Sequence, residues 1–96
     1  MKDPNDFKSI QEIRDNIDEI DYQILRLFGD RNQCVERIIN FKTDKEGVVA
    51  KKRQEELLEL RRTWANEFNI DPDLFEKVFK MLINSNIKKQ LEMLEP

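Results

Sequence analysis

The chain has 96 residues, enough for one domain at most and too few to bury a large share of its surface without help from a partner. Its 39% charged and 39% hydrophobic residues, with only two glycines and three prolines, favour amphipathic helices and disfavour a sheet. The net charge of -3, with basic and acidic residues interspersed, provides no basic stripe for a phosphate backbone, so we do not expect a nucleic-acid partner.

The first predicted helix runs from Ile10 to about Thr43. Ser9 and Glu12 have the spacing of a capping box, which satisfies the first free amides of a helix. Gly29 lies inside the helix and costs about 1 kcal/mol relative to alanine, but we expect the helix to continue through it. At 1.5 Å per residue this helix would be roughly 50 Å long. Its apolar stripe comprises Ile13, Ile17, Ile20, Ile24, Leu27, Cys34, Val35, Ile38 and Phe41.

Two further helices are predicted after a turn at residues 44–47. The second covers about residues 50–66, where apolar residues recur at helical spacing. Asp71 then has the position of an N-cap, followed by Pro72 at the first helical position. The third helix is expected to run from Pro72 to about Leu94, with a wide apolar stripe.

The length of the first helix predicts an oligomer. A compact monomer of this size has a radius of gyration of about 13 Å, so a helix of roughly 50 Å must pack on something outside its own chain. We therefore expect an all-α protein: a single domain over residues 1–96, with three helices per chain and a long first helix, assembled as an intertwined homodimeric helical bundle.

Four polar residues interrupt the apolar stripes, and buried polar groups need partners. Arg31 occupies one position of a seven-residue apolar series on the first helix, and Lys42, eleven residues on, falls on the same stripe. Asn86 and Gln90 lie on an inward stripe of the third helix. Together they would line a cavity of cations and amides suited to a small dianion.

Three of these four residues also have a purely structural interpretation. Arg31 could form a structural ion pair or extend its charged end to solvent. Lys42 could complement the dipole at a helix end, and Gln90 could be solvated or interfacial. Cys34, which has no histidine to activate it, is expected to be a small core residue.

Several kinds of chemistry are disfavoured. The sequence has no histidine, no glycine-rich phosphate loop and no serine elbow, so we expect no metal, no cofactor and no protein nucleophile. A single cysteine provides no intrachain disulfide and fits a reducing compartment. No apolar run approaches the about 20 residues of a membrane span, and the start lacks a signal-peptide core, so we expect a cytoplasmic protein without membrane contact.

The combined pattern resembles the helical, type II chorismate mutase family. The resemblance covers nearly the whole chain and rests on one set of residues and spacings. These are Ile13-Arg14-x-x-Ile17-Asp18-x-Ile20-Asp21, Arg31, Phe41-Lys42, Arg53 and Gln90. It implies an intertwined dimer with two equivalent sites, each taking Arg14 from one chain and the other groups from its partner.

The resemblance also implies roles for the site residues in a pericyclic reaction. Arg14 and Arg31 would bind the substrate carboxylates, helped by Arg53. Lys42 would donate to the ether oxygen as its bond to the ring breaks, and Gln90 would donate to the same oxygen or to the adjacent carboxylate. The segment 43–52 would form a mobile lid over the substrate.

Three further features are the opening Met1-Lys2-x-Pro4-x-Asp6, the loop ending in Ala50, and Arg62-x-Trp64-Ala65. With them the chain looks most similar, within this family, to isochorismate-pyruvate lyases, the salicylate-forming branch, which implies a place in siderophore or salicylate-derived metabolism. Mutases usually have an acid at the position of Ala50, a glutamate at Gln54 and a serine at Asn86, where these groups bind the ring hydroxyl and its neighbours. None of the three is retained here, but lyases often have an apolar residue at the position of Gln54, so the chain matches neither branch fully. Gln54 and Asn86 are the expected additional substrate contacts. Lyase activity with weak mutase activity is the expectation, and a chorismate or amino-chorismate mutase is the alternative. A helical dimeric interaction module remains the non-enzymatic alternative.

Overall fold

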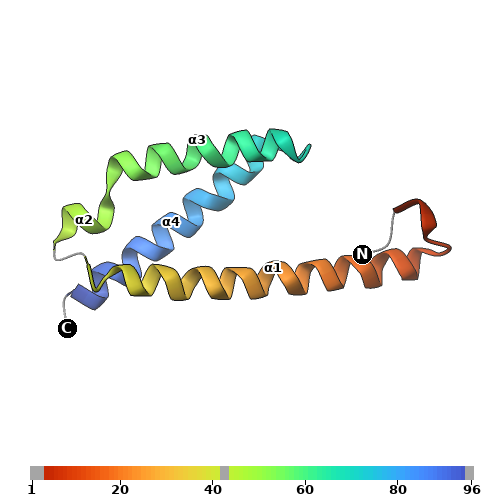
Figure 1. Cartoon of the computed structure of the whole chain (residues 1–96), viewed down its shortest axis with the longest axis horizontal. Coiled ribbons are helices and arrows are strands. Elements are labelled where there is room, and N and C mark those ends of the chain that lie inside the picture. The colour runs from red at the N-terminus through yellow and green to blue at the C-terminus, as the bar shows by residue number, and fades with distance from the viewer. Residues whose placement is uncertain (1–3, 42–43, 95–96) are drawn as a thin grey trace. The chain divides into compact units, whose positions relative to one another are not determined.

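The computed structural model describes residues 4–41 and 44–94, and all the regular elements in these ranges are helical. The chain divides into two compact units, residues 1–34 and 35–96. The elements are a short 3-10 helix η1 (Pro4–Asp6), the long α1 (Ile10–Ile38), the short α2 (Lys45–Val49), α3 (Lys51–Glu67) and α4 (Pro72–Leu94) (Figure 1). The all-α prediction is therefore confirmed for the described residues.

The first unit contains the start of α1, and its cap confirms the sequence prediction. The hydroxyl of Ser9 accepts a hydrogen bond from the backbone N–H of Glu12 at 3.1 Å. The carboxylate of Glu12 accepts a hydrogen bond from the backbone N–H of Lys8 at 2.7 Å. In a regular capping box the donor would be the N–H of Ser9, one residue later. Two free amides at this helix end thus gain acceptors.

Helix α1 continues through Gly29, as expected, but ends earlier than expected. Its last residue is Ile38, and residues 39–41, which were predicted to be helical, form a turn. Thr43, the predicted end of the helix, lies outside the described residues. The backbone N–H groups of Asn40 and Phe41 bond three residues back, to Arg37 and Ile38, so the chain tightens into turns. Asparagine is a poor helix former and favours such an ending.

No residue of α1 is buried, and most of its side chains are exposed. Ile17 is 48% exposed and Ile24 is 44% exposed. Cys34, expected to be a small core residue, is also exposed, so that expectation is wrong for the single chain. The apolar stripe is therefore present as predicted, and most of its residues are exposed in the single chain.

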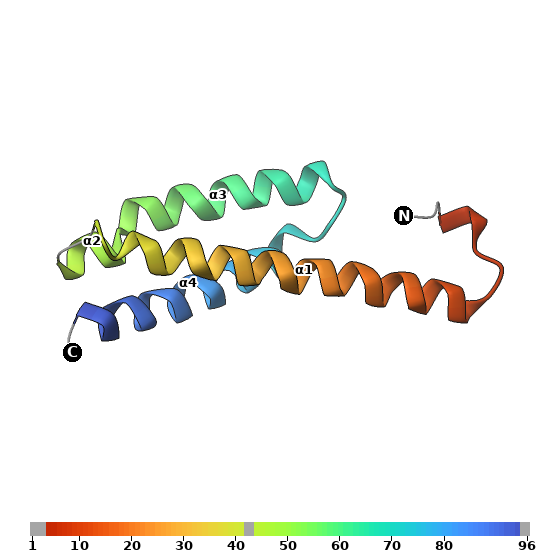
Figure 2. The same cartoon turned by 60° about the horizontal axis from the view of Figure 1, so that its bottom comes forward.

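The second unit is built on an antiparallel pair, α3 and α4, with α2 packed against α4 (Figures 1 and 2). The bounds of α3 and α4 agree with the predicted second and third helices to within one residue. In both views α2 lies at the end of the pair where α3 begins and α4 ends. The buried apolar residues described in this unit are Val48, Leu57, Ala65 and Ile83. The polar residue Gln90 is also buried.

The connection between α3 and α4 is short and contains several hydrogen bonds. Asn69 adopts a left-handed backbone at φ 57°, a conformation that asparagine tolerates, and the N–H of Ile70 donates to the carbonyl of Ala65 at 2.9 Å. The carboxylate of Asp71 then caps α4, accepting from the N–H of Asp73 at 2.9 Å. This confirms the predicted N-cap.

One predicted turn is wrong. Residues 44–47 were expected to form a loop, but α2 begins there, because the carboxylate of Asp44 accepts from the N–H of Gly47 at 2.7 Å and caps the helix. The sequence showed only turn-forming residues, whereas Asp44 also serves as a helix start. None of the described helices combines the length and the apolar character needed to cross a membrane.

Candidate functional site

Two of the predicted carboxylate-binding residues lie on α1. Arg14 is exposed and Arg31 is half-buried. They are 17 positions apart, which corresponds to about 25 Å along a helix axis. One chain therefore does not bring these two side chains to the same small molecule, and each must work with groups from elsewhere.

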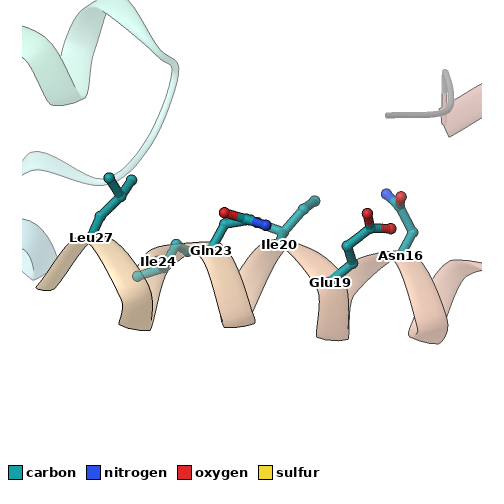
Figure 3. Close-up of a pocket in the computed structure, with 6 residues that line it drawn as sticks. All are labelled: Asn16, Glu19, Ile20, Gln23, Ile24 and Leu27. Atoms are coloured by element: carbon teal, nitrogen blue, oxygen red, sulfur yellow. The ribbon is translucent and has the colours of Figure 1, made fainter. Parts of the chain in front are cut away.

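The face of α1 between these arginines carries an elongated groove of about 250 Å³ (Figure 3). It is mainly apolar, with polar side chains along it that can hydrogen-bond. The residues that line it are Asn16, Glu19, Ile20, Gln23, Ile24 and Leu27. Figure 3 shows that these side chains all come from one helix, so the groove is open to whatever packs on α1.

Arg53 and Gln54 lie at the joint between α2 and α3. Arg53 is exposed in the first turn of α3, and Gln54 is half-buried beside it. The Gln54 Nε2 donates to the backbone carbonyl of Val49, the last residue of α2, at 2.6 Å. Between the two helices Ala50 has a left-handed backbone, φ 43° and ψ 60°, and its N–H donates to Glu46. The joint is thus defined by one strained residue and one side-chain amide.

Asn86 and Gln90 share a face of α4, as the spacing predicted. Asn86 is half-buried, and Gln90 is only 4% exposed. The Gln90 Nε2 donates to the backbone carbonyl of Val35, in the last turn of α1, at 2.7 Å. Beside it, Lys89 forms an ion pair with Glu36. Gln90 is therefore inward-facing and hydrogen-bonded, and the solvated alternative does not hold.

The predicted set is only partly brought together. Arg53 and Gln54 are adjacent on α3, and Asn86 and Gln90 are one turn apart on α4, all within the second unit. Arg14 and Arg31 belong to the first unit. Lys42, the predicted ether-oxygen donor, lies outside the described residues. Among the described residues, no group of three histidine, cysteine or acidic side chains is arranged to hold a metal ion.

The structure adds contacts that the sequence did not reveal. The carbonyls of Val35 and Val49 accept from the two glutamines, and backbone acceptors have no sequence signature. The guanidinium of Arg61 lies over the ring of Trp64, 4.7 Å from its centroid, and 5.6 Å from that of Phe79. The three-residue spacing of Arg61 and Trp64 on a helix could have predicted that stack.

Comparisons with known proteins identify the family. The model of the family described as chorismate mutase type II matches residues 13–91. An isochorismate pyruvate lyase of Pseudomonas aeruginosa is 32% identical over 92 residues, covering 96% of this chain and 91% of that protein. A chorismate mutase of Methanocaldococcus jannaschii is 31% identical over 90 residues, covering 92% of this chain and 90% of that protein. The chain belongs to the type II chorismate mutase family.

Proposed function

We propose that this member of the type II chorismate mutase family is an isochorismate-pyruvate lyase, converting isochorismate to salicylate and pyruvate, with weak chorismate mutase activity. The two relatives are almost equally similar to the chain, so identity does not choose between the activities. The choice rests on the joint between α2 and α3.

That joint is the observation that carries the proposal. In mutases, by the resemblance described above, an acid at position 50 and a glutamate at position 54 bind the ring hydroxyl. Ala50 has no polar side-chain atom, and the neutral amide of Gln54 is already bonded to the Val49 carbonyl. A neutral amide is a weaker acceptor than a carboxylate for a hydroxyl group. Support for the ring hydroxyl is therefore reduced, which favours the elimination over the rearrangement.

Catalysis in this proposal needs no covalent intermediate. Arg14, Arg31 and Arg53 bind the two carboxylates and hold the enolpyruvyl group over the ring, which removes orientational freedom before the reaction. Asn86 contributes a further contact. In the lyase reaction the ether C–O bond breaks while a ring hydrogen moves to the enolpyruvyl methylene carbon, giving pyruvate and an aromatic ring.

Lys42 and Gln90 stabilise the charge that develops on the ether oxygen. A side-chain amide nitrogen carries two N–H groups. One N–H of Gln90 donates to the Val35 carbonyl. In this proposal the second N–H donates to the substrate. The same bond to Val35 fixes the orientation of the Gln90 amide group.

A second copy of the chain completes the proposed site. Arg14 and Arg31 lie about 25 Å apart along α1, and the apolar stripe between them is uncovered in the single chain. A homodimer in which the α1 helices pair would cover this stripe and bring Arg14 of one chain to the cations and amides of the other.

The assignment is tested with purified protein given isochorismate and chorismate in separate assays. Salicylate fluorescence reports the lyase reaction, and prephenate formation reports the mutase reaction. Salicylate formed much faster than prephenate supports the proposal, and the activity should persist in a chelator. Faster prephenate formation would instead establish a mutase in which Gln54 replaces the usual glutamate. Inactivity on both would favour an amino-substituted substrate or an interaction module.

A further inference from the structure

The side chain of Gln54, near the start of α3, forms a hydrogen bond with the end of α2. The carbonyl of Val49 ends α2 and has no partner within that helix, since the last carbonyls of a helix lack intrahelical donors. Gln54, on the first turns of α3, supplies the missing donor at 2.6 Å. Its side chain therefore connects α2 to α3 across Ala50.

The helix held in this way is itself anchored. Val48 is 3% exposed, and α2 packs on α4. A five-residue helix has little stability of its own, so its position depends on this packing and on its two ends. Asp44 caps its start, and Gln54 caps its finish. The orientation of α3 relative to α2 then follows from the backbone of Ala50, which is left-handed and unfavourable for alanine.

We propose that Gln54 is a positioning residue that holds the α2–α3 joint and thereby places Arg53 for substrate binding. Arg53 precedes Gln54 directly, so the bond that holds Gln54 also holds the turn that carries Arg53. This turn lies at the end of the α3–α4 pair where α4 also ends, and Gln90 is in the last turns of α4 (Figures 1 and 2). The proposal rests on the proposed function, and it replaces the expectation that Gln54 binds substrate itself.

The test uses Gln54→Met, which keeps the length of the side chain and removes its donor. Gln11→Met is the matched control, because Gln11 is exposed on α1 and donates to Asp15, one turn along the same helix. Amide hydrogen exchange at Ala50, whose N–H closes the end of α2, reports the joint directly. Enzyme assays with isochorismate and chorismate report KM and kcat for whichever substrate the wild-type protein converts.

With Gln54→Met we expect exchange at Ala50 to accelerate about two- to tenfold, the range for the loss of one hydrogen bond. KM should rise by a similar factor with kcat within about twofold, since ground-state and transition-state binding by Arg53 weaken together. The effect on KM should largely disappear when Arg53 is already alanine, as expected for residues that act through one another. Gln11→Met should change none of these values.

Three results would overturn the positioning role. A raised KM with unchanged exchange at Ala50 would mean that Gln54 touches the substrate itself. Faster exchange at Ala50 with an unchanged KM would mean that Gln54 serves only the stability of the joint. Fully additive effects of Gln54→Met and Arg53→Ala on KM would mean that Gln54 does not act through Arg53. A wild-type protein that converts neither substrate would instead overturn the proposed function, and the positioning proposal with it.

Discussion

Gln90 caps the C-terminal end of α1 from a different helix: its Nε2 donates to the Val35 carbonyl at 2.7 Å. The backbone N–H of Ile39, which would normally bond Val35, bonds Glu36 instead. The amide of Gln90 thus satisfies a helix-end carbonyl that the backbone leaves without its usual donor. The same residue is our proposed donor to the ether oxygen, so replacing it should affect both the stability of the protein and its turnover.

Gln90→Met should lower both stability and turnover. Removing the donor leaves the Val35 carbonyl without this bond and should reduce the free energy of unfolding by about 1–3 kcal/mol, measured by urea denaturation. Turnover by the folded protein should fall by at least about tenfold. The neighbouring Lys89→Met is the control, because the Lys89–Glu36 pair is about half exposed and should contribute under about 1 kcal/mol. A Gln90→Met protein as stable as wild type would contradict the capping role.

Lys42→Ala should lower turnover by at least about 100-fold, the scale for deleting one donor that stabilises developing charge. Circular dichroism should show unchanged helix content. Lys77→Ala, which removes an exposed lysine from α4, is the control and should retain full activity. If Lys42→Ala is as active as wild type, Lys42 is not the ether-oxygen donor, and the interaction-module alternative gains weight.

Mixing two inactive variants should restore activity if each site takes Arg14 from one chain and Gln90 from the other. Arg14→Ala and Gln90→Ala proteins would be unfolded together in equal amounts and refolded. Random pairing gives about half heterodimers, each with one intact site and one site that lacks both residues, so we expect about a quarter of wild-type activity. No recovery in a refolded, dimeric mixture would show that both residues serve the same chain's site.

Ala50→Gly should stabilise the protein. Alanine at φ 43° costs roughly 1–2 kcal/mol relative to its favoured backbone, whereas glycine adopts this conformation freely. Part of that gain is offset because glycine loses more freedom on folding, so we expect a net gain of up to about 1 kcal/mol. Ala65→Gly, the same change inside α3, should destabilise by about 1 kcal/mol or more. Thermal unfolding of the two variants should therefore shift in opposite directions.

The sequence predicted the elements well where helical periodicity and capping act together. Ser9 and Asp71 marked two helix starts correctly, and the α4 bounds agree with the prediction. The prediction failed where local signals were ambiguous. Asp44 is as common in turns as at helix starts, and periodicity alone could not show that α1 stops at Ile38.

The site was predictable as a set of residue types but not as a set of contacts. Helical spacing predicted inward-facing positions for Asn86 and Gln90. The structure confirms this for Gln90, which is buried, while Asn86 is half-buried. Gln54 and Gln90 donate to backbone carbonyls five and 55 residues away in the sequence. Every residue has a backbone carbonyl, so the sequence does not show which one is the acceptor. Only the folded chain shows that these amides hold helix ends together.

The closed turn between α3 and α4 has a consequence for the order of assembly. Its bonds join residues that are close in sequence: Asn69 to Asn66, Ile70 to Ala65, and Arg62 to Pro72, Asp73 and Glu76. Short loops close quickly and lose little entropy, so in the proposed homodimer this helical hairpin should form within a single chain before two chains meet. Refolding followed by Trp64 fluorescence should then show a fast phase independent of protein concentration, followed by a slower phase that accelerates as concentration rises.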